Sequence, residues 1–247
     1  MKFWRSCRRL AAVLRRVWSG WRQIVTDFPR LAPDQREARV QAWALDMLHC
    51  LGVQLDVQGQ VPRNGPLLLV ANHISWLDIL VMHAARHCRF VSKADVKRWP
   101  VVGTLATGAG TLYIERSSRR DALRVVHDMA QALRDGDVLA VFPEGTTSNG
   151  QAMLPFHANL LQAAISAPAP VLPVALQYLD PATGAPTRAA SYVGDESLVG
   201  SVWRTLSADG VRAVLHFGTP EQALGRDRRE MARELHAAVA ALRTLAA

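Results

Sequence analysis

Cysteine is scarce in this chain of 247 residues, and the three cysteines are not spaced as pairs. Cys7, Cys50 and Cys88 form an odd number, and no C-x-x-C motif occurs. Secreted disulfide frameworks and zinc ribbons need paired or closely spaced cysteines. We therefore expect three reduced thiols in a protein that faces the cytosol, with neither a disulfide nor a metal site.

Four common catalytic signatures are also missing. The chain contains no G-x-S-x-G, no G-x-x-x-x-G-K-[ST], no G-x-G-x-x-G and no H-E-x-x-H. These motifs build, in turn, a serine nucleophile elbow, a phosphate-binding loop, a dinucleotide site and a zinc site. Their absence argues against a serine hydrolase, a nucleoside triphosphatase, a dinucleotide enzyme and a zinc enzyme.

Acidic residues are absent from the first 22 positions, which makes the charge of the chain uneven. This stretch has a net charge of +7, and the whole chain has +8, so the rest is left with the difference of +1. The cations are Lys2, Arg5, Arg8, Arg9, Arg15, Arg16 and Arg22. A nucleic-acid enzyme more often has a basic body, so we expect no nucleic-acid partner.

Long apolar runs are missing from the same stretch. Its longest run, Leu10–Leu14, is far short of the roughly 20 residues of a spanning helix or the roughly 7–15 of a signal-peptide core. Apolar residues instead recur at helical spacing, with the arginines mostly opposite: Leu10, Val13, Leu14, Val17, Trp18, Trp21 and Val25. A basic helix with tryptophans is typical of an anionic membrane interface; a helix packed on its own domain is the alternative.

A second periodic segment, residues 34–50, follows the break at Phe28-Pro29. An ordinary core-facing helix and a second membrane-contacting helix explain it equally well. We assign residues 1–50 to amphipathic helices that contact the membrane and residues 51–247 to the main domain.

Strand-like and helix-like segments alternate through residues 51–247. The expected strands are 53–57, 66–71, 89–92, 111–115, 138–142, 171–177, 192–193 and 211–217. The expected helices are 76–87, 96–107 (interrupted at Pro100), 121–134, 157–166, 198–206 and 226–245. This alternation predicts an α/β fold with a mostly parallel central sheet flanked by helices.

A histidine and an aspartate lie where one of these strands gives way to a helix. His73 follows the strand 66–71, and Asp78 lies in the first turn of the helix if Ser75 is its N-cap. Ligands of parallel sheets bind beyond the carboxyl ends of strands. From the first turn, the Asp78 carboxylate could orient the His73 ring as a general base. Alternatively, Ser75-x-x-Asp78 is only a capping box.

Two further strand ends carry polar groups. The segment Phe142-Pro143-Glu144-Gly145-Thr146-Thr147-Ser148 offers a glycine for close backbone approach and three hydroxyls, although a polar turn explains it equally well. The segment Tyr113-Ile114-Glu115-Arg116 ends in an arginine suited to a phosphate or carboxylate.

Together these segments resemble the four ordered blocks of the glycerolipid acyltransferase family. The blocks are Asn72-His73 with Asp78, Tyr113-Ile114-Glu115-Arg116, Phe142-Pro143-Glu144-Gly145-Thr146, and Val171-Leu172-Pro173-Val174. The resemblance runs from about residue 50 to 220 and is nearest to the bacterial 1-acyl-glycerol-3-phosphate acyltransferases. It implies transfer of a fatty acyl group from acyl-CoA or acyl-carrier protein, as co-substrate, to a lysolipid hydroxyl, without a cofactor or an acyl-enzyme.

The resemblance also implies roles for individual residues. His73 is the general base and Asp78 is its partner. Arg116 holds the acceptor phosphate, while Glu144, Gly145, Thr146 and Thr147 form the acceptor site. Lys93 is similar to a family lysine near the thioester, where it would stabilise the developing oxyanion; a surface lysine is the alternative.

Two departures from the family pattern leave the acceptor open. Many members have Arg where this chain has Thr147, and often Lys where it has His157. We expect 1-acyl-sn-glycerol-3-phosphate as the acceptor, giving phosphatidic acid, with lyso-ornithine lipid or another lysophospholipid as the alternative. The implied location is the cytoplasmic face of the inner membrane, peripheral or monotopic. A non-catalytic membrane-binding or nucleic-acid-binding protein would leave the four blocks unexplained.

Overall fold

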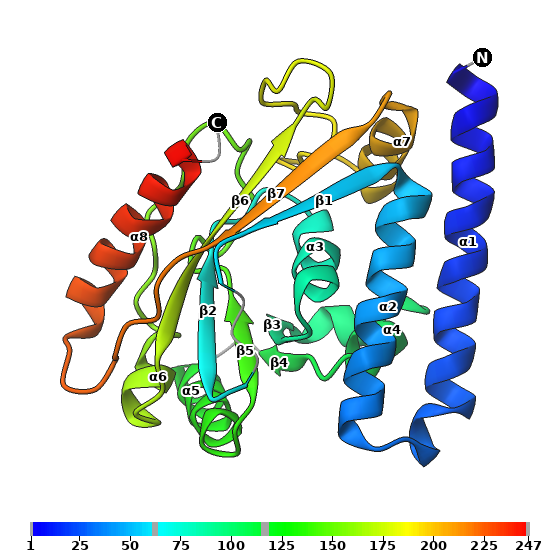
Figure 1. Ribbon diagram of the computed structural model, residues 1–247. Coiled ribbons are helices and arrows are strands. Elements are labelled where there is room, and N and C mark those ends of the chain that lie inside the picture. Colours follow the sequence, from blue (N-terminus) through cyan, green and yellow to red (C-terminus); the bar gives the residue numbers. More distant parts are fainter. Residues whose placement is uncertain (1, 61–63, 115–118, 246–247) are drawn as a thin grey trace.

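The computed structural model describes residues 2–60, 64–114 and 119–245 (Figure 1). Within these ranges, seven strands form one sheet in the order β1-β7-β6-β2-β5-β3-β4. They are β1 (Val53–Gln58), β2 (Leu67–Ala71), β3 (Arg89–Lys93), β4 (Leu112–Ile114), β5 (Val138–Val141), β6 (Val171–Leu179) and β7 (Val211–Phe217). Neighbouring strands are parallel except β6 and β7, so the predicted mostly parallel sheet is confirmed.

Helices cover both faces of the sheet. They are α1 (Lys2–Thr26), α2 (Pro33–Leu51), α3 (Leu77–Ala85), α4 (Val102–Gly108), α5 (Arg119–Arg134), α6 (Gln162–Ser166), α7 (Leu198–Ser207) and α8 (Arg228–Leu245), with 3₁₀ turns η1 (Phe28–Arg30) and η2 (Ala94–Arg98). Buried side chains of α2, α3 and α7 pack on one face, and those of α5, α6 and α8 pack on the other (Figure 1).

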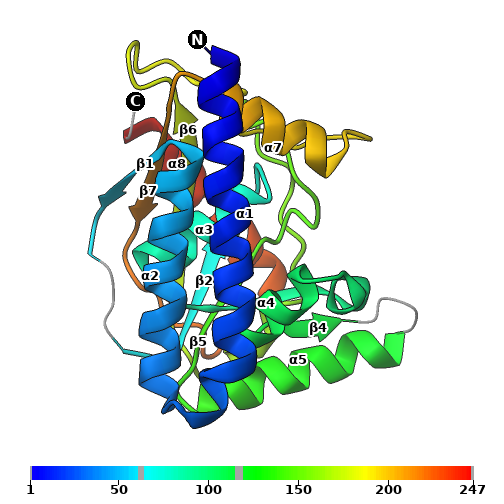
Figure 2. The ribbon, with the colours of Figure 1, turned by 90° about the vertical axis from the view of Figure 1, so that its right-hand side faces the viewer.

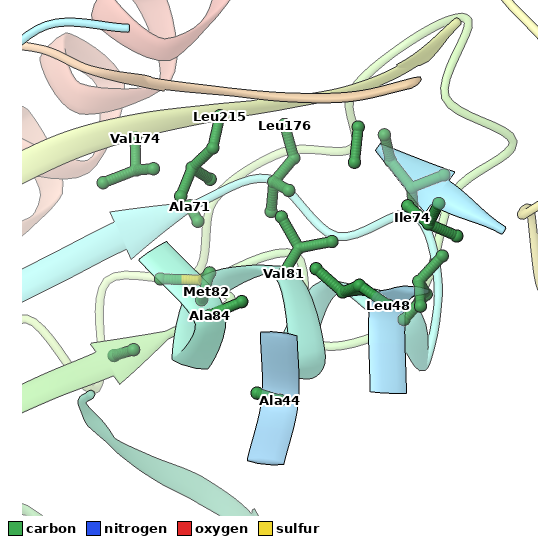
Figure 3. Packing of buried hydrophobic residues seen from close by; sticks show 14 of the residues in the cluster. Ala44, Leu48, Ala71, Ile74, Val81, Met82, Ala84, Val174, Leu176 and Leu215 are labelled. Carbon is green, nitrogen blue, oxygen red and sulfur yellow. The ribbon is translucent and has the colours of Figure 1, made fainter. Parts of the chain in front are cut away.

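Strand β2 lies at the centre because both of its faces are apolar. Leu67, Leu69 and Ala71 point to the cluster under α2 and α3, whereas Leu68 and Val70 point to the cluster under α5, α6 and α8. Figure 3 shows Ala71 with Val81 and Met82 of α3 and, beyond them, Leu48 of α2. Burying a leucine side chain fully is worth about 1.5–3 kcal/mol, so β2 is a rigid support for the residues that follow it.

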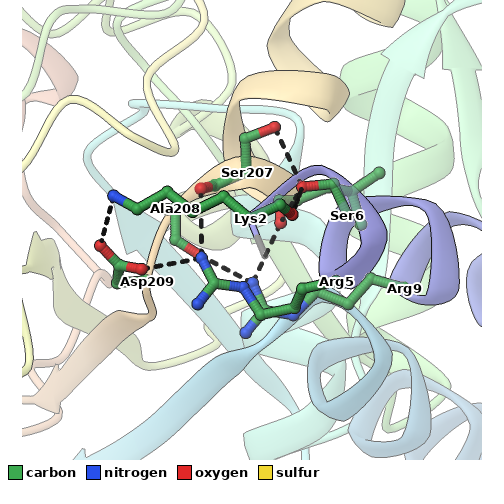
Figure 4. Close-up of polar contacts among 8 residues, drawn as sticks. Lys2, Arg5, Ser6, Arg9, Ser207, Ala208 and Asp209 are labelled. Atoms are coloured by element: carbon green, nitrogen blue, oxygen red, sulfur yellow. Dashed lines mark hydrogen bonds and ion pairs between the residues drawn. The ribbon is translucent and has the colours of Figure 1, made fainter.

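Helix α1 is tied to the C-terminal end of α7 by its own cations (Figure 4). Nη1 of Arg9 donates to the carbonyl oxygens of Leu206, at 3.0 Å, and Ala208, at 2.8 Å. Arg5 and Lys2 both pair with Asp209, at 2.8 and 3.0 Å. Cations stabilise the unsatisfied carbonyls at a helix C-terminus. Part of the basic N-terminus therefore holds α1 to the main domain.

The apolar stripe predicted for α1 is divided between two surfaces. Leu10, Val13 and Val17 pack against the core, whereas Leu14 and Trp18 are exposed. Figure 2 shows α7 beside the N-terminal half of α1 and α4 beside its C-terminal half. The sequence did not separate these surfaces because both fall within one wide arc of the helix. No described helix is long and apolar enough to cross a membrane.

Three local predictions need correction. The helix expected from His157 begins only at Gln162, because Pro143 O accepts a hydrogen bond from His157 N and holds the preceding segment extended as a loop. Tyr192 and Val193 form no strand; Tyr192 N donates to Ile74 O instead. Helix α3 spans Leu77–Ala85, shorter than the predicted 76–87. The three cysteines are free, and Cys88 is buried.

Candidate active site

The chain leaves β2 at a buried asparagine that fixes the turn. Asn72 is 1% exposed, and its amide group donates to Leu176 O at 3.1 Å and accepts from Leu176 N at 2.7 Å. The Asn72 side chain thus makes the two hydrogen bonds to Leu176 that main-chain atoms would make if β2 continued beside β6. The main chain is free to turn away from the sheet, and His73 comes directly after this point.

His73 and Asp78 meet as the sequence predicted. Nδ1 of His73 lies 2.7 Å from Oδ2 of Asp78, and the two side chains are 19% and 0% exposed. His73 precedes the helix and Asp78 is the second residue of α3. Ser75 is not the N-cap residue, which is Trp76, although Ser75 Oγ still accepts from Leu77 N at 3.2 Å. An ionised carboxylate only accepts hydrogen bonds, so the hydrogen sits on Nδ1 and Nε2 is left to take a proton.

The Asp78 carboxylate is fully satisfied by hydrogen bonds. Oδ2 also accepts from the main-chain N–H groups of Ile74, at 2.6 Å, and Ser75, at 3.0 Å. Oδ1 accepts from the hydroxyl of Tyr178 at 2.7 Å. These donors compensate the cost of burying a charge. The capping interaction and the contact with His73 therefore coexist in one carboxylate.

Two aromatic side chains support this pair, and the sequence analysis identified neither. Tyr178 is buried on β6, and burial together with the nearby Asp78 charge raises the pKa of its hydroxyl well above the usual value. The ring of Phe142 stacks on that of His73, with centroids 4.0 Å apart and planes at 8°. Phe142 is the first residue of the third block, so its place in that block could have indicated that it lies near His73. Tyr178 lies four residues after Val174, the last residue of the fourth block. Alternate residues of a strand point to the same face of a sheet, so Tyr178 lies on the same face as Val174.

The Glu144 carboxylate is buried and hydrogen-bonds to the main chain. Glu144 is 3% exposed, and its oxygens accept from His73 N at 2.6 Å and from Leu154 N at 2.7 Å. Burial raises the pKa of the carboxyl group, while these two N–H donors oppose the rise. The carboxylate therefore joins the loop after β5 to the loop after β2.

The rest of the loop after β5 presents smaller groups. Gly145 has φ of 73°, a conformation that favours glycine, and the ring of His157 lies 3.4 Å from the place its Cβ would occupy. Thr146 is exposed and Thr147 is half-buried. Ser148 donates through its N–H and hydroxyl to His73 O, at 2.8 and 3.1 Å. The structure thus brings this block next to His73.

Two predicted cations lie further along the sheet. Lys93 is exposed at the end of β3, which is separated from β2 by β5. Arg116 lies outside the described residues. Among the residues that are described, no group of three or more His, Cys, Asp or Glu side chains is arranged to hold a metal ion.

Comparison with known proteins identifies the family. The family model described as Acyltransferase matches residues 53–177. This chain belongs to the acyltransferase family. It is 37% identical to a lyso-ornithine lipid O-acyltransferase of Pseudomonas aeruginosa, over 83% of this chain and 78% of the relative. It is 41% identical to a 1-acyl-sn-glycerol-3-phosphate acyltransferase of Neisseria gonorrhoeae, over 71% and 68% of the two chains.

A solved structure shares the fold of this acyltransferase. The crystal structure of PlsC, a 1-acyl-sn-glycerophosphate acyltransferase from Thermotoga maritima, superposes with a TM-score of 0.71 over 98% of both chains. Only 19% of the residues are identical. At this identity the likeness shows a shared fold.

Proposed function

We propose that this acyltransferase moves a fatty acyl group from a thioester of coenzyme A or acyl-carrier protein to the free hydroxyl of a lysolipid. The hydrogen-bonded pair of His73 and Asp78 carries the proposal, since it places a base at the carboxyl end of the central strand. The names of the relatives, which act on lysolipids, support the acceptor class. The thioester is a co-substrate, and the reaction calls for no resident cofactor.

In the proposed reaction, Nε2 of His73 takes the proton of the acceptor hydroxyl while that oxygen bonds to the thioester carbonyl carbon. The carbonyl electrons move to oxygen and give a tetrahedral oxyanion. Its collapse re-forms the carbonyl, breaks the carbon–sulfur bond and expels the thiolate, which takes the proton from His73. Asp78 stabilises the imidazolium between these steps, and Tyr178 and Phe142 hold the two side chains in place.

The remaining residues of the proposed site bind the substrates. Lys93 stabilises the oxyanion, and Arg116 holds the acceptor headgroup. Gly145, Thr146 and Thr147 form the acceptor surface beside His73, and the buried Glu144 holds their loop in position. Glu144 thus acts through the main chain rather than by touching the acceptor.

We propose 1-acyl-sn-glycerol-3-phosphate as the acceptor and phosphatidic acid as the product. Lyso-ornithine lipid is the second candidate, because uncharged Thr147 and His157 stand where the family often has cations. Relatives with both names match this chain at similar identity. The deciding experiment incubates the purified full chain with labelled acyl-CoA or acyl-carrier protein and a panel of lysolipids. Labelled phosphatidic acid supports the first acceptor, labelled ornithine lipid supports the second, and no labelled lipid contradicts the function.

We propose that the exposed side of α1 contacts the membrane, with residues 1–50 as the membrane-binding part of the chain. Trp4, Leu14, Trp18 and Val25 are exposed there, beside a row of exposed arginines at seven-residue spacing: Arg8, Arg15 and Arg22. Tryptophans enter the headgroup region while arginines extend to lipid phosphates. Both acceptor and product are lipids, so this contact brings the site to its substrate. The proposed location is the cytoplasmic face of the inner membrane, where the thioester donors are made.

A further inference from the structure

A cavity of about 470 Å³ lies where the C-terminal end of α1 meets the start of α2, η2 and α4. Its walls include the apolar side chains of Ile24 and Phe28 together with two cations, Arg36 and Lys97. Thr104 and Thr107 also line the cavity, and the Thr107 hydroxyl lies 2.9 Å from the hydroxyl of Tyr113. It shares no residue with the site around His73.

The two cations of this cavity lack anionic partners. Within the described part of the chain, neither Arg36 nor Lys97 forms an ion pair, and the buried Nε of Arg36 has no hydrogen-bond partner. Lys97 lies over the ring of Tyr113, with Nζ 5.7 Å from the centroid. Two like charges facing one cavity repel each other unless an anion joins them. A phosphate group, which accepts several hydrogen bonds from guanidinium, ammonium and hydroxyl donors, fits this set.

Exposed apolar residues that adjoin the lining residues in the sequence, here called the rim, indicate where the phosphate comes from. Val25 follows the lining residue Ile24, and Trp99, Val101 and Val102 lie between the lining residues Lys97 and Gly103. Val101 has φ of 62°, a conformation that is costly for a β-branched residue and that persists where the surroundings impose it. A soluble phosphate has no apolar part that could contact the apolar rim. A phospholipid has one, because its glycerol and acyl parts lie beside its headgroup.

We propose that this cavity binds the headgroup phosphate of an anionic membrane lipid, separately from the acceptor at His73. Arg36 and Lys97 hold the phosphate, Thr104 donates its hydroxyl hydrogen, and the rim residues enter the lipid layer. Helix α4, which carries lining residues of the cavity, lies beside the C-terminal half of α1, the helix proposed to contact the membrane (Figure 2). The lipid assignment rests on the membrane contact proposed for α1, whereas the phosphate site itself does not.

The test measures binding of the full chain to vesicles of phosphatidylcholine with and without phosphatidylglycerol. The double variant Arg36→Gln/Lys97→Gln is expected to lose roughly thirtyfold in affinity for the phosphatidylglycerol vesicles. Its matched control, Arg229→Gln/Arg233→Gln, removes the same charge from exposed positions outside the cavity and outside residues 1–50, and is expected to lose less than threefold. The uncharged change Thr104→Val is expected to weaken binding several-fold, which a general charge effect would not do. Melting temperatures of all variants check folding.

Soluble probes separate the sources of the phosphate. Inorganic phosphate and coenzyme A are titrated into the wild type and the double variant, and each is then added to the vesicle assay. If the site binds a lipid, inorganic phosphate and coenzyme A should bind weakly and should not compete with the vesicles. Equal vesicle binding by the double variant and its control would overturn the site. Tight competition by coenzyme A would overturn the lipid assignment. Acyl transfer to detergent-dispersed lysolipid is expected to stay unchanged in the double variant, so the catalytic proposal is tested separately.

Discussion

The hydroxyl of Tyr178 donates to Oδ1 of Asp78 across 2.7 Å, from a strand that lies 100 residues further along the chain. The other oxygen of Asp78 contacts His73, so the three side chains form one hydrogen-bonded row. The tyrosine hydroxyl withdraws negative charge from the carboxylate and fixes its rotation. Tyr178 is therefore expected to adjust both the position and the basicity of His73.

The variant Tyr178→Phe tests this role without changing the shape of the core. We expect kcat to fall roughly tenfold with KM little changed, since a hydrogen bond to a charged group is worth about 1.5–3 kcal/mol. More negative charge stays on Asp78, so the imidazolium is favoured and the acidic limb of the pH–rate profile moves to higher pH. Thr205→Val, which removes a buried hydroxyl from α7, is the control and should leave the profile in place. A profile that did not move in Tyr178→Phe would leave this residue a purely structural role.

Neighbouring arginines of α1 are expected to behave differently because they face opposite surroundings. Arg9 donates to the C-terminal carbonyls of α7, whereas Arg8 is exposed. Arg9→Met should lower the free energy of unfolding by about 1–3 kcal/mol. Arg8→Met should leave that free energy within about 0.5 kcal/mol but weaken binding to anionic vesicles several-fold. Chemical denaturation and vesicle sedimentation measure the two effects, and identical results for both variants would refute the two-sided description of α1.

Stability in acid is expected to depend on His83. This side chain is 4% exposed, and burial lowers its pKa from 6.5 to about 3, with the nearby His87 adding to the effect. Between these values the unfolded chain binds a proton that the folded chain does not. The free energy of unfolding should therefore fall as the pH drops from 6.5 to 3, by up to about 1.4 kcal/mol per unit from this group.

The measurement compares the pH dependence of unfolding in His83→Gln with that in His127→Gln. His127 is exposed on α5, so its replacement should leave the slope unchanged. The His83 variant is less stable overall, but its slope between pH 6.5 and 3 should be smaller by close to one proton. Equal slopes in the two variants would mean that His83 takes up its proton in the folded state as readily as in the unfolded state.

Most of the fold followed from local patterns in the sequence. Continuous apolar runs such as Leu67–Ala71 predicted buried parallel strands, and the strand bounds agree closely with the structure. The contact between His73 and Asp78 was predicted because both lie within one turn between a strand and a helix. Local signals of this kind need no knowledge of which segments come together later.

The features of the site and of α1 that the sequence did not reveal depend on long-range contacts. Tyr178 looked like any apolar strand residue, because its partner Asp78 lies on a distant element. The cations of α1 looked alike, and only the position of α7 divides Arg5 and Arg9 from Arg8. Glu144 was predicted to help form the acceptor site, but its hydrogen bonds to main-chain N–H groups in two separate loops could not be predicted. Tertiary pairing of this type leaves no periodic trace in the sequence.

The role of His73 as the base in acyl transfer is tested by the rate of transfer in variants of His73 and Asp78. Labelled acyl groups are followed from acyl-CoA or acyl-carrier protein into the best acceptor of the lysolipid panel, with wild type, His73→Ala and Asp78→Asn compared at equal folded concentration. General-base catalysis contributes roughly 10²–10⁴-fold, so His73→Ala should lose at least a hundredfold in rate, with a smaller but clear loss in Asp78→Asn. Transfer by folded His73→Ala at the wild-type rate would show that His73 is not the base.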